Sequence, residues 1–220
     1  MNNIRFNPWV GDKYSWGIIG YDTNGKVIYG TASQLGKKIL VLGESHYCAN
    51  PETEATPFLT INIIADLLNP DSEWEAYKNT YTKFIKSLTG CVDGLEQSVK
   101  EKAWQHIMFY NYVQTPMSGA RVAPTAEDFK NSEKAFFEVL QTYKPDFVIA
   151  WGNRLYNNLP KGGKQLNDLN IATGRFAGNS TELWSYNVND NSIPVMPITH
   201  PSTGYSIALF NSFFRELILK

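Results

Sequence analysis

Four polar side chains that can do chemistry follow two apolar segments that lie far apart in this chain. Glu44, Ser45 and His46 come directly after the apolar run 38–43, and His200 follows a second apolar run near the C-terminus. In an open parallel sheet, the loops at the carboxyl ends of neighbouring strands line one crevice. A carboxylate, a hydroxyl and two imidazoles can transfer protons and stabilise developing charge. We therefore expect these side chains to surround one ligand at the carboxyl edge of a sheet.

Strands and helices alternate along the predicted chain, and this order decides where the polar side chains lie. Apolar runs that end at polar or glycine residues predict strands, at 38–43, 107–113, 145–152, 182–188 and 194–199. Apolar residues at helical spacing predict helices, at 56–68, 74–88, 95–104, 125–143, 153–160 and 205–219. The Gly- and Asn-rich stretch 161–180 is expected to be a loop. This alternation predicts an α/β fold, a three-layer α/β/α sandwich with a mostly parallel central sheet.

Two local motifs mark the starts of predicted helices. Thr56-Pro57 places a hydroxyl N-cap before a proline at the first helical position. Thr125 and Asp128 form a capping-box pattern with aspartate in place of glutamate.

The N-terminal part of the chain has a different pattern. Asn24-Gly25 lies between two β-prone stretches and predicts a hairpin within residues 16–31. We therefore expect residues 1–36 to form a β-hairpin appendage and residues 37–220 to form the main domain.

Composition restricts the class of protein and its compartment. The chain has 220 residues, is 43% hydrophobic and carries a formal net charge of −1, which suits one compact domain. Proteins that bind long stretches of nucleic acid are usually basic, so any such contact should be local. No apolar run reaches the roughly 18 residues of a membrane helix, and the start lacks a signal-peptide pattern. We expect a cytoplasmic protein that does not enter a membrane, whose oligomeric state the sequence leaves open.

The cysteines bear on redox chemistry and on metal binding. Cys48 and Cys91 fit a reducing compartment better than a disulfide framework. Two cysteines are too few for a four-cysteine zinc or iron–sulfur site. We expect no metal and no cofactor.

Five motifs of this chain occur in the order that is found in one enzyme superfamily. They are Gly43-Glu-Ser-His-Tyr47, Pro57-Phe58, Phe109-Tyr-Asn111, Val148-Ile-Ala-Trp-Gly152 and His200-Pro-Ser202. From residue 37 onward, the chain resembles the uracil-DNA glycosylase superfamily. The resemblance implies the fold of that superfamily and hydrolysis of the N-glycosidic bond of uracil or a related damaged base, a step of base excision repair.

The resemblance also implies roles for individual residues. His200 would donate a hydrogen bond to the pyrimidine O2, and Asn111 would read the base edge with its amide. Phe58 would stack on the extruded base. Glu44 would position water or support the sugar cation, and Tyr47 matches a tyrosine that excludes the thymine methyl group.

Some residues of the matched loops are expected to line the site, and others differ from the residues usual in the superfamily. Gly43 and Ser202 are expected to line the substrate site. Ser45 occupies the position of a catalytic aspartate in the best-known branch, and a serine cannot act as a general base. His46 stands where many members carry proline, and it could supply the missing catalytic group. The superfamily usually follows His-Pro-Ser with a proline and an apolar wedge that props open duplex DNA, whereas Thr203-Gly204-Tyr205 follows here. Tyr205 could be a wedge, but capping of the last helix is the better explanation, and single-stranded DNA or a nucleoside-like small molecule would need no wedge.

Two other functions stay open at this level. A non-catalytic nucleic-acid or nucleotide-binding module on the same fold fits the missing aspartate and the mild acidity. An esterase-like hydrolase would use Ser45 as nucleophile and His200 as base, but Tyr47 replaces the second glycine of the required Gly-x-Ser-x-Gly turn. Six scattered basic residues could contact phosphate, but their scatter favours a solvated surface: Arg121, Lys130, Arg154, Lys161, Lys164 and Arg175.

Overall fold

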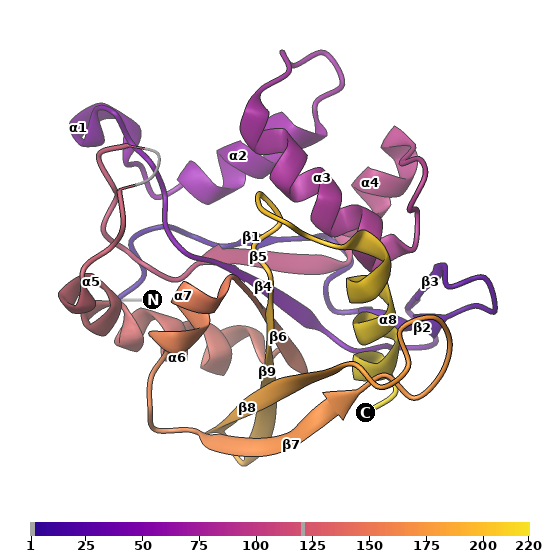
Figure 1. The fold of residues 1–220 in the computed structure, drawn as a ribbon. Coiled ribbons are helices and arrows are strands. Elements are labelled where there is room, and N and C mark those ends of the chain that lie inside the picture. The colour runs from indigo at the N-terminus through magenta and orange to yellow at the C-terminus, as the bar shows by residue number, and fades with distance from the viewer. Residues whose placement is uncertain (1–2, 120–121) are drawn as a thin grey trace.

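The computed structural model describes residues 3–119 and 122–220, which form a layered α/β fold (Figure 1). The central sheet has seven strands in the order β1-β5-β4-β6-β9-β8-β7. Their bounds are β1 Trp9–Val10, β4 Ile39–Gly43, β5 Ile107–Asn111, β6 Phe147–Trp151, β7 Lys164–Asn170, β8 Ser180–Val188 and β9 Asn191–Ile198. Strands β5, β4, β6 and β9 are parallel, and β1, β8 and β7 flank them in antiparallel pairs. The predicted α/β class is confirmed, and the parallel strands form the centre of the sheet.

Helices cover both faces of the sheet, so the predicted three layers are present (Figure 1). One face carries α2 Leu59–Leu68, α3 Ala76–Thr89, α4 Gln97–Gln105 and α8 Ile207–Ile218. The other face carries α5 Ala126–Asn131, α6 Glu133–Tyr143 and α7 Asn153–Asn157. Successive side chains of a strand point to opposite faces, so Val41 packs in the first core cluster and Leu42 in the second. No helix within the described ranges is both long and apolar enough to cross a membrane.

Local sequence signals set several of the helix ends. The Thr125 hydroxyl accepts from the Asp128 N–H, and the Asp128 carboxylate accepts from the Thr125 N–H at 2.9 Å, so the predicted capping box is confirmed. Gly90 ends α3 at a φ of 73°, a conformation that favours glycine. The helix predicted over 125–143 is two helices that meet at Ser132, whose φ of −88° and ψ of −9° depart from the α-helix and whose hydroxyl donates to the Asp128 carbonyl at 2.7 Å.

Three further boundaries differ from the prediction. The stretch 161–180 was expected to be a loop, but it contains the edge strand β7, whose mostly exposed residues lack the apolar alternation of a half-buried strand. The helix expected to begin at Thr56-Pro57 begins at Leu59, with Phe58 as its N-cap. A short helix, α1 Pro51–Glu54, was not predicted.

The N-terminal segment is packed into the fold. The predicted hairpin is confirmed as a separate two-stranded sheet of β2 Ile18–Tyr21 and β3 Val27–Tyr29. The Tyr21 hydroxyl donates to the Leu88 carbonyl of α3 at 3.0 Å. Phe6 is fully buried, and β1 joins the central sheet beside β5. The segment expected to be an appendage therefore supplies a strand and buried side chains to the main fold.

The strand order reverses beside β4, and this reversal defines the place where a ligand would bind. The chain continues from β4 to β5 on one side, and it later enters β6 on the other side. In open α/β sheets, ligands bind outside the carboxyl ends of the strands at such a reversal. The candidate residues follow the carboxyl ends of β4, β5, β6 and β9, and the fold brings these four ends to one edge.

Candidate functional site

Residues at the ends of four parallel strands meet at the carboxyl edge of the sheet. Asn111 ends β5 and lies opposite Gly43, which ends β4. Gly152 follows β6, and a Cβ placed on Gly152 would lie 3.4 Å from the Cβ of His200, which follows β9. Gly152 has a φ of 92°, which side chains rarely adopt, so this turn requires glycine.

Glu44 is held at this edge by a two-point ion pair with Arg154. Arg154 Nε donates to Glu44 Oε2 at 2.8 Å, and Arg154 Nη2 donates to Glu44 Oε1. The Glu44 side chain is only 14% exposed, whereas that of Arg154 is 56% exposed. A planar guanidinium is suited to this bidentate contact. Sequence reasoning grouped Arg154 with scattered surface cations and missed the pair, although Arg154 comes only two residues after Gly152 at the same edge.

His200 is oriented by its own loop. The Ser202 backbone N–H donates to His200 Nδ1 at 3.2 Å, and Ser202 Oγ lies 2.7 Å from the same atom. Because Nδ1 accepts a hydrogen bond, the proton of the neutral ring lies on Nε2. Burial lowers the pKa of His200, Glu44 acts to raise it, and Arg154 acts to lower it. At pH 7 His200 is therefore a neutral ring that can donate through Nε2.

His46 is buried next to Asn111. His46 is 2% exposed, Asn111 4% and Thr60 1%. His46 Nε2 lies 2.9 Å from Thr60 Oγ1, and Asn111 Nδ2 lies 3.1 Å from His46 Nδ1. Phe6 places its ring edge-on to the imidazole at 4.9 Å. Burial lowers the pKa of His46 to about 4, so this histidine is neutral at pH 7 and shielded from solvent, a setting that suits support of Asn111 better than proton transfer.

The remaining candidates of the first loop are less enclosed. Ser45 is half-buried, and no described residue forms a hydrogen bond with its hydroxyl. Because His200 Nδ1 is taken by Ser202, the hydroxyl of Ser45 lacks the paired base that an esterase needs. Tyr47 and Phe58 are each 57% exposed, so both side chains are accessible from solvent.

Tyr205 and the scattered cations differ in how they relate to the strand edge. Tyr205 stacks on Phe210 with ring centroids 4.6 Å apart, and its hydroxyl lies 2.5 Å from Ser87 Oγ, so it is packed inward and cannot act as a wedge. Arg121 lies outside the described residues. The other five cations are exposed, and of these only Arg154 pairs with a residue of the strand edge: Lys130, Arg154, Lys161, Lys164 and Arg175.

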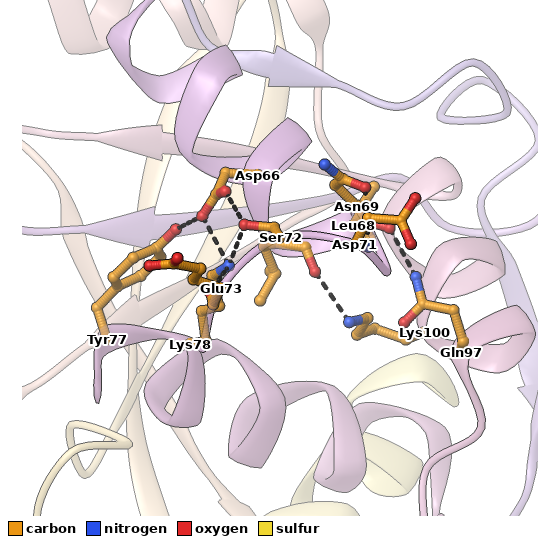
Figure 2. A network of polar contacts seen from close by, with 11 residues as sticks. Asp66, Leu68, Asn69, Asp71, Ser72, Glu73, Tyr77, Lys78, Gln97 and Lys100 are labelled. Carbon is orange, nitrogen blue, oxygen red and sulfur yellow. Dashed lines mark hydrogen bonds and ion pairs between the residues drawn. The ribbon is translucent and has the colours of Figure 1, made fainter. Parts of the chain in front are cut away.

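A second polar cluster lies between α2 and α3, and sequence reasoning missed it. The Asp66 carboxylate accepts hydrogen bonds from Ser72, Tyr77 and Lys78, with Lys78 Nζ at 2.9 Å (Figure 2). Lys78 Nζ also donates to Ser72 Oγ at 2.7 Å and to the Glu73 carbonyl at 2.6 Å. This cluster borders a surface hollow of about 200 Å³. Because its carboxylate and its ammonium are already occupied by protein groups, the cluster fastens the α2–α3 loop.

The described residues contain no metal-binding cluster that would indicate a function, and the comparisons with known proteins do not indicate one either. Within residues 3–119 and 122–220, no three His, Cys, Asp or Glu side chains lie close enough together to bind one metal ion. In comparisons with known proteins, no family model and no curated sequence matches this chain. The function is therefore inferred from the geometry of the strand edge.

Proposed function

We propose that this protein is a DNA base glycosylase that hydrolyses the N-glycosidic bond of uracil or a related damaged base. In this reaction the C1′–N1 bond breaks with its electron pair on the base, and the oxygen of water bonds to C1′. The proton released by water ends on the departing base. The observation that carries the proposal is the convergence of a neutral histidine donor, a buried amide and a carboxylate at one strand-order reversal.

His200 would stabilise the departing base. Negative charge develops on the pyrimidine O2 as the bond breaks, and a fixed donor there lowers the barrier. The tautomer set by Ser202 leaves Nε2–H as that donor. A neutral donor suits this step because it needs no proton uptake before the reaction.

Glu44 would support the positive charge on the sugar or orient the attacking water. Its carboxylate is fixed by Arg154 in a largely buried position, which restricts its motion. A fixed carboxylate beside a developing cation is electrostatically favourable without reorganisation during the reaction. Ser45 supplies no carboxylate of its own, so Glu44 is the acidic group of this loop.

Asn111, Phe58 and Tyr47 would hold the base. The Asn111 amide can pair with the edge of uracil, and Phe58 is exposed enough to stack on its face. Tyr205 is packed inward against Phe210, so it is not placed to separate a duplex. Single-stranded DNA is therefore the preferred substrate of this proposal.

The test is release of base from labelled oligonucleotides that carry uracil, hypoxanthine or a G·T mismatch, in single- and double-stranded form. Alkali cleaves the abasic product, and His200→Ala should remove the signal. His106→Asn is a matched control, because His106 precedes β5 at the opposite edge of the sheet from Asn111. No base release by the wild-type protein, or equal release by His200→Ala, would contradict the proposal.

A non-catalytic nucleotide-binding module is the second candidate, and one observation favours it. The carboxylate of Glu44 is engaged by Arg154, and Ser45 cannot replace it as a base. Binding of a uracil oligonucleotide without any abasic product would select this candidate.

A further inference from the structure

Asn111 lies over the face of a histidine ring. Its Nδ2 atom is 3.1 Å from His46 Nδ1 and 3.2 Å from His46 Nε2. An atom almost equally far from both nitrogens cannot lie in the ring plane at these distances, because it would overlap Cε1. The amide nitrogen therefore rests on the imidazole face, as in an N–H···π contact.

The ring is held so that this face stays turned toward Asn111. His46 Nε2 is 2.9 Å from Thr60 Oγ1 on α2, and Phe6 packs edge-on against the ring at 4.9 Å. Burial lowers the pKa of His46 to about 4, so the ring is neutral at pH 7. The face of a neutral aromatic ring is electron-rich. It attracts the amide N–H and repels the amide oxygen. The carboxamide of Asn111 is therefore held with its nitrogen toward the ring and its oxygen away from it.

The oxygen of Asn111 is consequently the free end of the amide. No described residue donates a hydrogen bond to Asn111 Oδ1, and this oxygen is not among the fully buried atoms that lack a partner. It occupies space beside Gly43, where an added Cβ would lie 2.2 Å from it. Asn111 thus presents a fixed acceptor in the space that the missing side chain of Gly43 leaves beside it.

We propose that His46 is a positioning residue that sets base selectivity by holding the oxygen of Asn111 toward the base. This inference rests on the proposed function. A fixed acceptor favours a base whose facing ring nitrogen carries hydrogen, as N3–H of uracil does. It disfavours cytosine, whose N3 presents a lone pair to the same oxygen.

The first measurement reads the position of Asn111 without any ligand. In ¹H–¹⁵N spectra, the Asn111 side-chain amide is assigned by its loss in Asn111→Asp. A proton held over the imidazole face should resonate clearly upfield of ordinary side-chain amides. The upfield shift should persist in His46→Phe, which keeps an aromatic face, and disappear in His46→Leu. An ordinary shift in the wild-type protein would overturn the proposed contact, whatever the protein does.

The second measurement reads selectivity. Binding is compared for single-stranded oligonucleotides carrying 2′-fluoroarabino-uracil or 2′-fluoroarabino-cytosine, whose glycosidic bonds resist hydrolysis. The wild-type protein and His46→Phe should prefer uracil by roughly 10- to 100-fold, the range for one mispaired buried hydrogen bond. His46→Leu should bind the two with nearly equal affinity.

The outcomes separate this inference from the proposed function. An unchanged preference in a folded His46→Leu would contradict only the role of His46. Binding of neither oligonucleotide by the wild-type protein would contradict the proposed function and the selectivity together. Thr60→Val provides a second test with an intact ring, because loss of the Thr60 contact should weaken the preference without removing the aromatic face.

Discussion

Two carboxylate–cation pairs of this protein show how similar groups can serve different ends. The pair of Glu44 and Arg154 joins the loop after β4 to α7, which follows β6, at the carboxyl edge of the sheet. Asp66 and Lys78 join the end of one helix to the start of the next (Figure 2). Both pairs combine one acid with one base, but their surroundings differ.

The difference lies in how many partners each carboxylate has and which partner is exposed. Asp66 accepts from Ser72, Tyr77 and Lys78, and Lys78 is the more buried member at 11% exposure. Glu44 is held only by Arg154 among the described residues, and here the cation is the exposed member. A carboxylate saturated by its own segment stabilises structure, whereas one held by a single partner keeps lone pairs that can accept from a water or a substrate.

Removing the charge of Glu44 should have the largest effect. Under the proposed function, Glu44→Gln should lower the rate of uracil release by roughly 100-fold or more, the usual scale for a lost catalytic carboxylate. Thermal unfolding should change little, because glutamine keeps the shape and one acceptor. A single-turnover assay measures the rate. A variant that released uracil at the wild-type rate would remove Glu44 from the mechanism and end the contrast with Asp66.

Changing Arg154 should have a smaller effect on the same rate. Arg154→Lys keeps the charge but loses the two-point contact, so Glu44 would become less well placed. We expect a loss of roughly 10-fold in kcat/KM, within the range for a misplaced catalytic group. Steady-state kinetics with Arg154→Lys and Arg154→Ala would separate charge from geometry. Equal rates for Arg154→Lys and wild type would show that the two-point contact with Glu44 is dispensable.

The α2–α3 cluster should give the opposite result. Asp66→Asn leaves the Lys78 ammonium without its counter-charge, and it should lower the free energy of unfolding by about 1–2 kcal/mol. The melting temperature would fall by roughly 2–8 °C, while uracil release at 25 °C would stay at the wild-type rate. Calorimetry and the base-release assay are read together. A strong loss of release in a stable Asp66→Asn protein would make this cluster part of the functional site.

The loss of stability at low pH should also depend on the α2–α3 cluster, through the carboxylate of Asp66. Hydrogen bonds from Ser72, Tyr77 and Lys78 lower the pKa of Asp66 from 3.8 to about 2. A lowered carboxyl pKa stabilises the fold above pH 3.8, and this stabilisation is lost as the pH falls through about 2. Because the Asp66 side chain is 38% exposed, screening by solvent reduces the contribution to about 1 kcal/mol or less. Denaturant unfolding at several pH values should therefore show a shallower acid loss in Asp66→Asn than in wild type.

The smallest expected effect is a change in the pKa of His200 when either member of the Glu44–Arg154 pair is replaced. Burial holds this pKa below 6.5, with Glu44 raising it and Arg154 lowering it. Arg154→Gln removes the lowering cation, so the pKa should rise. Glu44→Gln removes the raising anion, so the pKa should fall. Titration of the His200 ring by NMR measures both shifts, and a shift in the same direction for both variants would contradict the geometry of the pair.

The sequence alone was enough to predict the layered fold and the edge where its polar residues meet. Apolar runs that end at Gly43 and Gly152 specify buried strands because strands between two helical layers need apolar residues on both faces. The hairpin at Gly25 and the capping box at Thr125 follow from contacts between residues only a few positions apart. These features depend on local chemistry, which a sequence displays directly.

Tertiary structure alone decided how the side chains at that edge are used. The pairing of Glu44 with Arg154 and the stacking of Asn111 on His46 join residues that lie 110 and 65 positions apart. No local pattern encodes such contacts, because they arise only when four strands align and Phe6 from the N-terminal segment packs against the imidazole in a T-shaped contact. A loop histidine that seemed available for catalysis is therefore buried and neutral, and its chemistry is determined by what packs around it.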